Sequence, residues 1–227
     1  MTFLRVFARA LFCFILYFSL LFPERGAPAP DSSTFFYKIE PIPKDVRDRM
    51  ASSTWEPGCP VSLDDLSYLT LMHWGFDHRA HKGCLIVHGD AAEQIADVFR
   101  EMFLRKFPIQ RIGLASDLGG DDEKLMSQNV TSAFNCRPVT GRTGIFSKHS
   151  YGISIDINPV QNPYVKGTVV LPESSKGRIA RDSSRPGTIV KDDFLYRAFL
   201  RKGWTWGGDW RALKDYQHFE KKLPKKP

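Results

Sequence analysis

The sequence predicts an α+β fold in which an antiparallel sheet has helices packed on one side. Two stretches, residues 90–106 and 194–203, repeat apolar side chains at helical spacing. Other stretches, such as Ile153–Ile157, alternate apolar and polar residues as a strand with one buried face does. Gly, Pro and Ser gather between these stretches and predict short connections.

The ordered elements follow from local signals of the same kind. We expect helices at 45–51, from a capping-like start at Ser62–Asp65, from Asp90 to about Lys106, and from Phe194 to Gly203. We expect strands at 84–88, 109–115, 132–137 and 153–157, and a strand pair with a loop within 165–188. The polar, Gly-containing stretch 117–127 predicts a solvated acidic loop, and His73, His78, His81 and His88 predict a polar loop leading into a strand.

The length of 227 residues suits one domain with terminal additions. The formal charge is +7, of which Lys221, Lys222, Lys225 and Lys226 supply four, so the remainder carries 7 − 4 = +3. We therefore interpret residues 221–227 as a solvated basic tail. No basic stripe interleaved with aromatic residues is present, and we expect no nucleic-acid partner.

The N-terminus predicts export. Arg5 and Arg9 precede an apolar run from Ala10 to Phe22, which is shorter than the roughly 20 residues that span a bilayer. Residues 1–22 are therefore a signal peptide or a retained membrane anchor, and residues 23–60 a linker and N-terminal extension before a main domain at 61–220. Export to a bacterial periplasm or envelope permits one disulfide among Cys59, Cys84 and Cys136, and the pairing stays open.

The chemistry concentrates between Ser147 and Pro159. His149 lies on a turn, Gly152 allows a sharp entry into a strand, and Asp156 projects from that strand. An imidazole and a carboxylate in this arrangement suit Zn²⁺. The predicted third ligand is His218, with Asp215 on the same face if the segment makes a helical turn. Three protein ligands and an open position are typical of a catalytic site holding one zinc ion.

These residues resemble a known family. The pattern Ser147-x-His149-x-x-Gly152-x-x-x-Asp156 followed by Asp215-x-x-His218 is similar to that of zinc D-alanyl-D-alanine carboxypeptidases and dipeptidases. This family also includes L-alanyl-D-glutamate endopeptidases and is related in fold to the hedgehog domain. The similarity extends loosely over 60–220, and it includes the stretches 129–137 and 156–164.

The resemblance implies a zinc peptidase that hydrolyses peptidoglycan stem peptides, and we expect a monomer. It implies that Asp215 moves the proton of water, although other members have Glu there, and that Arg137 contacts the substrate beside the metal. Ser147 is the expected second substrate-binding residue. The fixed charge and planar donor fork of Arg137 suit a carboxylate or a developing oxyanion.

Two other functions are weighed against this one. The first is an inactive zinc-containing domain that binds peptidoglycan, which would need the metal but not Asp215. The second is a serine hydrolase built on Ser147 or Ser150 with His149. Residues so close on one turn do not easily aim a hydroxyl at an imidazole, and no G-x-S-x-G motif is present, so this function is disfavoured.

Overall fold

The computed structural model describes residues 34–139, 142 and 144–222. These residues form helices and mainly antiparallel strands, which confirms the α+β class. The helices are α1 (Lys44–Ala51), α2 (Gly89–Leu104), α3 (Asp122–Ser127) and α4 (Phe194–Arg201). The strands are β1 (Tyr37–Pro41), β2 (Leu66–Trp74), β3 (Ala80–His88), β4 (Arg111–Ile112), β5 (Val130–Thr131), β6 (Ser154–Asp156), β7 (Tyr164–Lys166), β8 (Val169–Leu171), β9 (Thr205–Trp206), β10 (Lys214–Asp215) and β11 (His218–Glu220).

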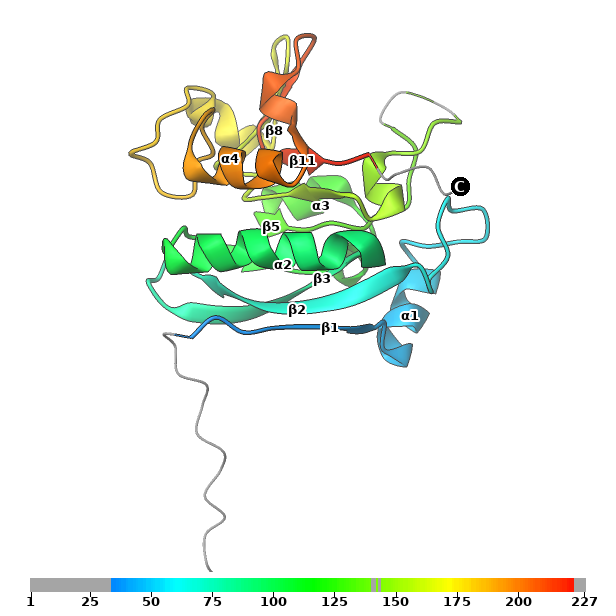
Figure 1. Cartoon of the computed structure of the whole chain (residues 1–227). Helices are drawn as coiled ribbons and strands as arrows, with labels where there is room; N and C mark the ends of the chain where they lie inside the picture. Colours follow the sequence, from blue (N-terminus) through cyan, green and yellow to red (C-terminus); the bar gives the residue numbers. More distant parts are fainter. Residues whose placement is uncertain (1–33, 140–141, 143, 223–227) are drawn as a thin grey trace, which may run out of the picture. The chain divides into compact units, whose positions relative to one another are not determined.

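Helix α2 lies at the centre of the main core. It crosses one face of the β1–β2–β3 sheet, with α4 and β11 on its other side (Figure 1). Its predicted apolar stripe is buried throughout: Ile95, Val98, Phe99, Met102 and Phe103. The stripe packs against residues of β2 and β3 and against Phe219 of β11. The helix therefore joins the large sheet to the strands that carry the site.

The prediction of a single sheet is wrong. In the described part of the chain the strands form four sheets, β1–β2–β3, β10–β7–β8, β6–β11–β9 and β4–β5, and the last is a parallel pair. The strands outside the first sheet have only two or three residues each, so their pairing comes from tertiary contacts rather than from a long alternating pattern. Helices also do not all lie on one side, because Val46 and Met50 of α1 pack with Ile86, whose strand neighbours Leu85 and Val87 face α2.

The expected N-terminal extension contributes to the same compact unit. Strand β1 pairs along β2 from Tyr37 opposite Leu71 to Pro41 opposite Ser67. The predicted helix at 45–51 is confirmed as α1, so the folded unit begins before the expected boundary at residue 61. The segments 1–22 and 23–33, and residues 223–227 of the basic tail, lie outside the described residues.

The helix predicted to begin at Ser62–Asp65 does not form. The Ser62 hydroxyl donates to Asp65 Oδ2 at 2.9 Å and accepts from the Asp65 backbone N–H at 3.2 Å, as in a capping box. The chain then enters strand β2, because pairing with β1 and β3 on both sides satisfies its backbone. The capping interaction between Ser62 and Asp65 therefore forms as predicted, but it stabilises a turn and not a helix.

Two predicted strands shrink and two predicted loops gain structure. The polar histidine loop is wrong, because His73 lies in β2 and His81 and His88 lie in β3. Only Arg111–Ile112 of 109–115 is a strand, and the stretch 132–137 contributes a single bridge, Ser132 to Asp156. The stretch 117–127 contains helix α3, because the Asp121 side chain accepts from the Lys124 N–H and caps it. The predicted helix at 194–203 and the strand pair within 165–188 are confirmed as α4 and as β7 with β8.

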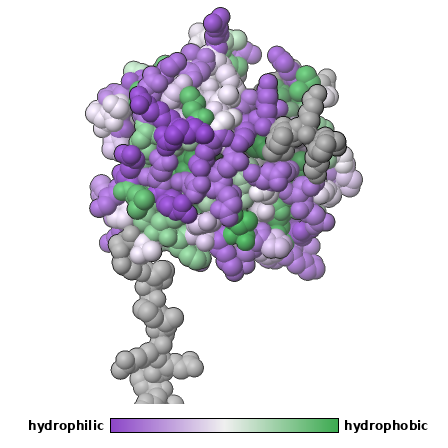
Figure 2. All heavy atoms as spheres, viewed as in Figure 1, coloured by the Kyte–Doolittle hydropathy of each residue, from purple (hydrophilic) through white to green (hydrophobic). Residues whose placement is uncertain are grey.

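The open disulfide assignment resolves to Cys59–Cys136, and Cys84 is free. This bond ties the connection after α1 to the stretch that carries Arg137. None of the described helices is long and apolar enough to cross a membrane. The face of the molecule in Figure 2 is largely hydrophilic, with separated apolar patches.

We expect Cys59→Ser to lower the free energy of unfolding by about 2–4 kcal/mol, since the bond closes a long loop in the unfolded chain. Urea denaturation of oxidised protein measures the change. Cys84→Ser is the matched control, and we expect it to leave the urea midpoint close to that of the wild type. An equal loss in both variants would contradict a stabilising role for the disulfide.

Candidate metal centre

Two paired strands bring together the first two residues of the site. Strand β6 runs antiparallel to β11 in a register that sets Asp156 opposite His218 and Ile155 opposite Phe219. Ile155 and Phe219 are fully buried in the main core and hold this register. His218 Nδ1 consequently lies 2.9 Å from Asp156 Oδ1.

His149 reaches the same point from the turn of 3-10 helix Lys148–Tyr151. The Ser147 hydroxyl caps the turn by accepting from the His149 N–H at 3.3 Å. Gly152 ends the turn at φ +66°, and a Cβ there would lie 2.6 Å from the backbone nitrogen of His88. A positive φ and a close backbone approach thus both require glycine here, and the predicted sharp entry into the strand is confirmed.

The three side chains converge as the sequence predicts. His149 Nε2 lies 3.2 Å from Asp156 Oδ2 and 3.2 Å from His218 Nδ1. One ligand atom from each residue lies within 4.8 Å of the other two, and both histidines are buried. Among the described residues this is the group of histidine, cysteine and acidic side chains placed to bind a metal ion.

The outer nitrogens of both histidines face hydrogen-bond acceptors. His149 Nδ1 donates to the Ala133 carbonyl oxygen at 2.5 Å, and His218 Nε2 donates to Glu220 Oε2 at 3.3 Å. When both rings are neutral, the inner nitrogens, His149 Nε2 and His218 Nδ1, therefore point lone pairs toward each other and toward the Asp156 carboxylate. Such an arrangement needs a proton or a cation at its centre, so the residues fit a metal ion.

In the metal-free protein a proton fills this need. Burial by itself would lower the pKa of His218, but hydrogen bonds to Asp156 and Glu220 outweigh it and raise this pKa to about 10. Burial would raise the pKa of Asp156, whereas the charges and hydrogen bonds of His149 and His218 lower it far below its ordinary value. A bound metal would take the place of the shared proton.

Asp215 lies near the group, but not through the predicted helical turn. It belongs to β10, where it pairs with Tyr164 of β7, and a tight connection then leads to His218 in β11. Asp215 Oδ1 is shielded from solvent and has no hydrogen-bond partner. Burial, and next the negative charge of Asp156, raise the pKa of Asp215 to about 7. The carboxyl is thus able to hold or release a proton near neutral pH.

These residues open onto a cleft of about 680 Å³. Asp156, Asp215 and His218 line it together with Arg137 and Ser147, so it contains every predicted site residue. Trp210 forms part of the wall, with its ring centroid 5.4 Å from that of His218. Trp204 and Trp206 are instead buried in the core.

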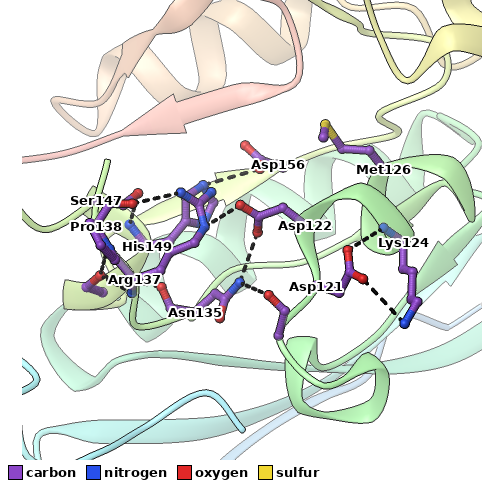
Figure 3. Close-up of polar contacts among 12 residues, drawn as sticks. Asp121, Asp122, Lys124, Met126, Asn135, Arg137, Pro138, Ser147, His149 and Asp156 are labelled. Carbon is purple, nitrogen blue, oxygen red and sulfur yellow. Dashed lines mark hydrogen bonds and ion pairs between the residues drawn. The ribbon is translucent and has the colours of Figure 1, made fainter. Parts of the chain in front are cut away.

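Arg137 lines the cleft near the turn that carries His149, and its guanidinium forms an ion pair with Asp122 (Figure 3). The predicted alternative, a serine nucleophile with His149, lacks the required contacts. Ser147 Oγ is used in the cap of its turn, and Ser150 Oγ donates to the Arg137 carbonyl oxygen at 2.8 Å. The His149 ring meets Ala133 and the other two ligand residues instead.

Several motif residues support the site without facing it. Asn158 is fully buried at φ +46° and donates to the Pro108 carbonyl oxygen at 2.8 Å. Asn162 accepts from the Ile189 N–H at 2.8 Å and from Arg181, which also stacks on Tyr216 beside Asp215. Arg181 donates to carbonyl groups along the loop, so its role is structural.

Sequence reasoning missed two side chains at the site. Glu220 lies two residues after His218 in β11, and strand periodicity could have placed both on one face. Asp122 lies in a stretch that we expected to be a solvated loop, and no local signal indicates its contact with Arg137, fifteen residues on.

Residues 140–221 match the family model described as D-alanyl-D-alanine carboxypeptidase. The matched segment contains His149, Asp156, Asp215 and His218, whereas Arg137 and Asp122 precede it. No solved structure matches the chain significantly. The match supports a metallopeptidase of the kind that acts on cell-wall peptides. The predicted resemblance is thus confirmed over residues 140–221, which are similar to the D-alanyl-D-alanine carboxypeptidase family and contain the three converging side chains.

Proposed function

We propose that this protein is an exported zinc peptidase that hydrolyses peptide bonds in the stem peptides of bacterial peptidoglycan, in the manner of a D-alanyl-D-alanine carboxypeptidase. One observation carries the proposal. The donor atoms of His149, Asp156 and His218 converge in a cleft that also holds a carboxyl group, Asp215, with a pKa of about 7.

The donor set favours zinc among common metals. Two imidazole nitrogens and one carboxylate oxygen are borderline ligands, and three protein ligands leave a position open. When bound, zinc supplies a Lewis acid that polarises a carbonyl oxygen and makes water more acidic. Ala133 and Glu220 hold the outer nitrogens of the histidines, which fixes the rings with their inner nitrogens toward the centre.

Asp215 is the proposed proton carrier. Its ionised carboxylate accepts a proton from the attacking water, and its protonated form delivers that proton to the amine that leaves. A pKa near the working pH suits a group that must do both. The pairing of β10 with β7 and the burial of Asp215 Oδ1 keep the carboxyl in place.

Arg137 and Ser147 are the proposed substrate-binding residues. The permanent positive charge of Arg137 would hold the terminal carboxylate of the substrate, or the negative charge that develops on the scissile carbonyl oxygen. Ser147 lines the cleft at the start of the turn that carries His149. We propose that the protein acts as a monomer, with residues 1–22 directing export or anchoring.

We expect wild-type protein to bind one zinc ion per chain and His149→Ala to lose it. Glu220→Gln keeps all three ligands but loses the carboxylate that orients His218, so we expect its zinc affinity to fall about 10- to 100-fold. Competition with a chromophoric chelator measures both. His78→Asn, in the exposed turn between β2 and β3, is the matched control and should bind zinc as the wild type does.

We expect Asp215→Asn to lower kcat by about 10²- to 10⁴-fold while zinc content stays at one ion, because the amide cannot accept a proton. Digestion of purified peptidoglycan, followed by mass spectrometry of the fragments, identifies the bond cleaved and gives the rate. Asp182→Asn is the control, because Asp182 is half-exposed and does not line the cleft. A wild-type protein that holds zinc and binds peptidoglycan but releases no fragment would instead be an inactive wall-binding domain.

The raised pKa of Asp215 predicts a pH dependence of stability in chelator-treated protein. The folded state keeps its proton up to about pH 7, whereas the unfolded chain releases it near pH 4, so the folded state binds more protons between these values. This contribution to stability is therefore lost as pH rises from about 4 to 7. Asp215→Asn lacks this pH-dependent contribution, so we expect its melting temperature to rise relative to that of the wild type between about pH 5 and pH 8. A constant difference would show an ordinary Asp215 pKa.

A further inference from the structure

We infer that Asp122, held by Asn135, is a positioning residue that orients the guanidinium of Arg137 toward a carboxylate in the cleft. Asp122 Oδ2 forms an ion pair with Arg137 Nε, and both residues line the cleft. The inference rests on the proposed function in one respect, the assignment of Arg137 as a substrate-binding residue.

The Asp122 side chain is held in place by the buried amide of Asn135. Asp122 Oδ1 accepts from Asn135 Nδ2 at 2.9 Å, and the same amide donates to the Gly120 carbonyl oxygen at 2.9 Å. Asn135 is 4% exposed, and its backbone N–H donates to the His149 carbonyl oxygen at 3.2 Å. Figure 3 shows Asp122 between Asn135 and Arg137. Both carboxylate oxygens are therefore engaged, and the network ends at the turn that carries a metal-ligand residue.

The backbone conformation that brings Asp122 to Arg137 requires a glycine at position 120. Gly120 has φ +74°, and a Cβ at this position would lie 3.1–3.2 Å from Thr54, Asn135 and the Ser53 carbonyl oxygen. Asp121 caps α3, which starts the helix at Asp122 and directs the next side chain toward the cleft. A solvated loop would make none of these contacts, so the acidic stretch is ordered by the site.

The Arg137 backbone is also fixed, which leaves the side chain as the part that needs orienting. Its N–H donates to Ser150 Oγ at 2.9 Å, and its carbonyl accepts from the Ser147 N–H at 3.0 Å. Arg137 Nη1 has only a 3.4 Å contact with its neighbour Pro138, and within the described part of the chain no hydrogen bond to Nη2 is found. An arginine held at Nε can present its two Nη groups to a planar anion.

The orientation matters because a free arginine side chain has many rotamers. Ordering one on binding costs conformational entropy, and this loss is avoided when the protein has already fixed the side chain. A surface ion pair by itself contributes little, but here the other Asp122 oxygen is held by Asn135, and both side chains of the pair are less than one-third exposed. The expected ligand class is a small acyl amino acid or peptide with a free carboxylate.

The experiment is a double-mutant cycle on zinc-loaded protein, with N-acetyl-D-alanine as the probe in calorimetry. The variants are Asp122→Asn, Arg137→Ala and the double variant. We expect Asp122→Asn to weaken probe binding about tenfold, and to change it less than about twofold when Arg137 is already alanine. Asp121→Asn, which keeps the cap on α3, is the matched control and should bind as the wild type does.

A second readout reports the orientation directly. The Arg137 Nε–H signal in a ¹H–¹⁵N NMR spectrum, assigned by its loss in Arg137→Ala, should move to the position of free arginine in Asp122→Asn and stay unchanged in Asp121→Asn. The inference is overturned if this signal does not move, if Asp122→Asn weakens binding equally with and without Arg137, or if the wild type does not bind the probe. A wild type that binds the probe but cleaves no stem peptide contradicts the proposed function and leaves this inference standing.

Discussion

The antiparallel register between β6 and β11 is the constraint on which the site depends. It places Asp156 directly opposite His218, and the buried pair Ile155 and Phe219 on the adjacent positions prevents a slip. A shift by one residue would turn both ligand side chains to the other face and bring two core side chains into the cleft. The geometry of this candidate metal site is therefore stabilised by the same apolar contacts that stabilise the core.

Electrostatics explains why this group is costly to bury and yet well defined. Two imidazoles and a carboxylate meet at about 3 Å, and each outer nitrogen has its own acceptor in Ala133 or Glu220. Hydrogen bonds to Asp156 and Glu220 raise the pKa of His218, so a proton can occupy the centre when no metal is bound. The negative charge of Asp156 adds to burial in raising the pKa of Asp215. The carboxyl with the unusual pKa is thus a consequence of the neighbouring ligand set.

The loops around the cleft are ordered by buried amides and one arginine instead of by regular strands. Asn158, Asn162 and Arg181 bond to backbone groups that short strands leave unpaired. Asn135 does the same for the acidic stretch before α3 and connects it to the turn of His149. In this fold, polar side chains replace the long ladders that would otherwise satisfy the backbone, and the cleft walls are held with little secondary structure.

The sequence by itself determined the α+β class, α2 and α4, the role of Gly152 and the convergence of His149, Asp156 and His218, because these depend on local periodicity or on a motif with fixed spacing. The tertiary structure alone decided the partition into four sheets, the Cys59–Cys136 pairing, the strand at Asp215 and the contact of Asp122 with Arg137. Strands of two or three residues have no pattern of their own, and pairings between distant side chains depend on how the core packs. Such features exist only once the chain has folded.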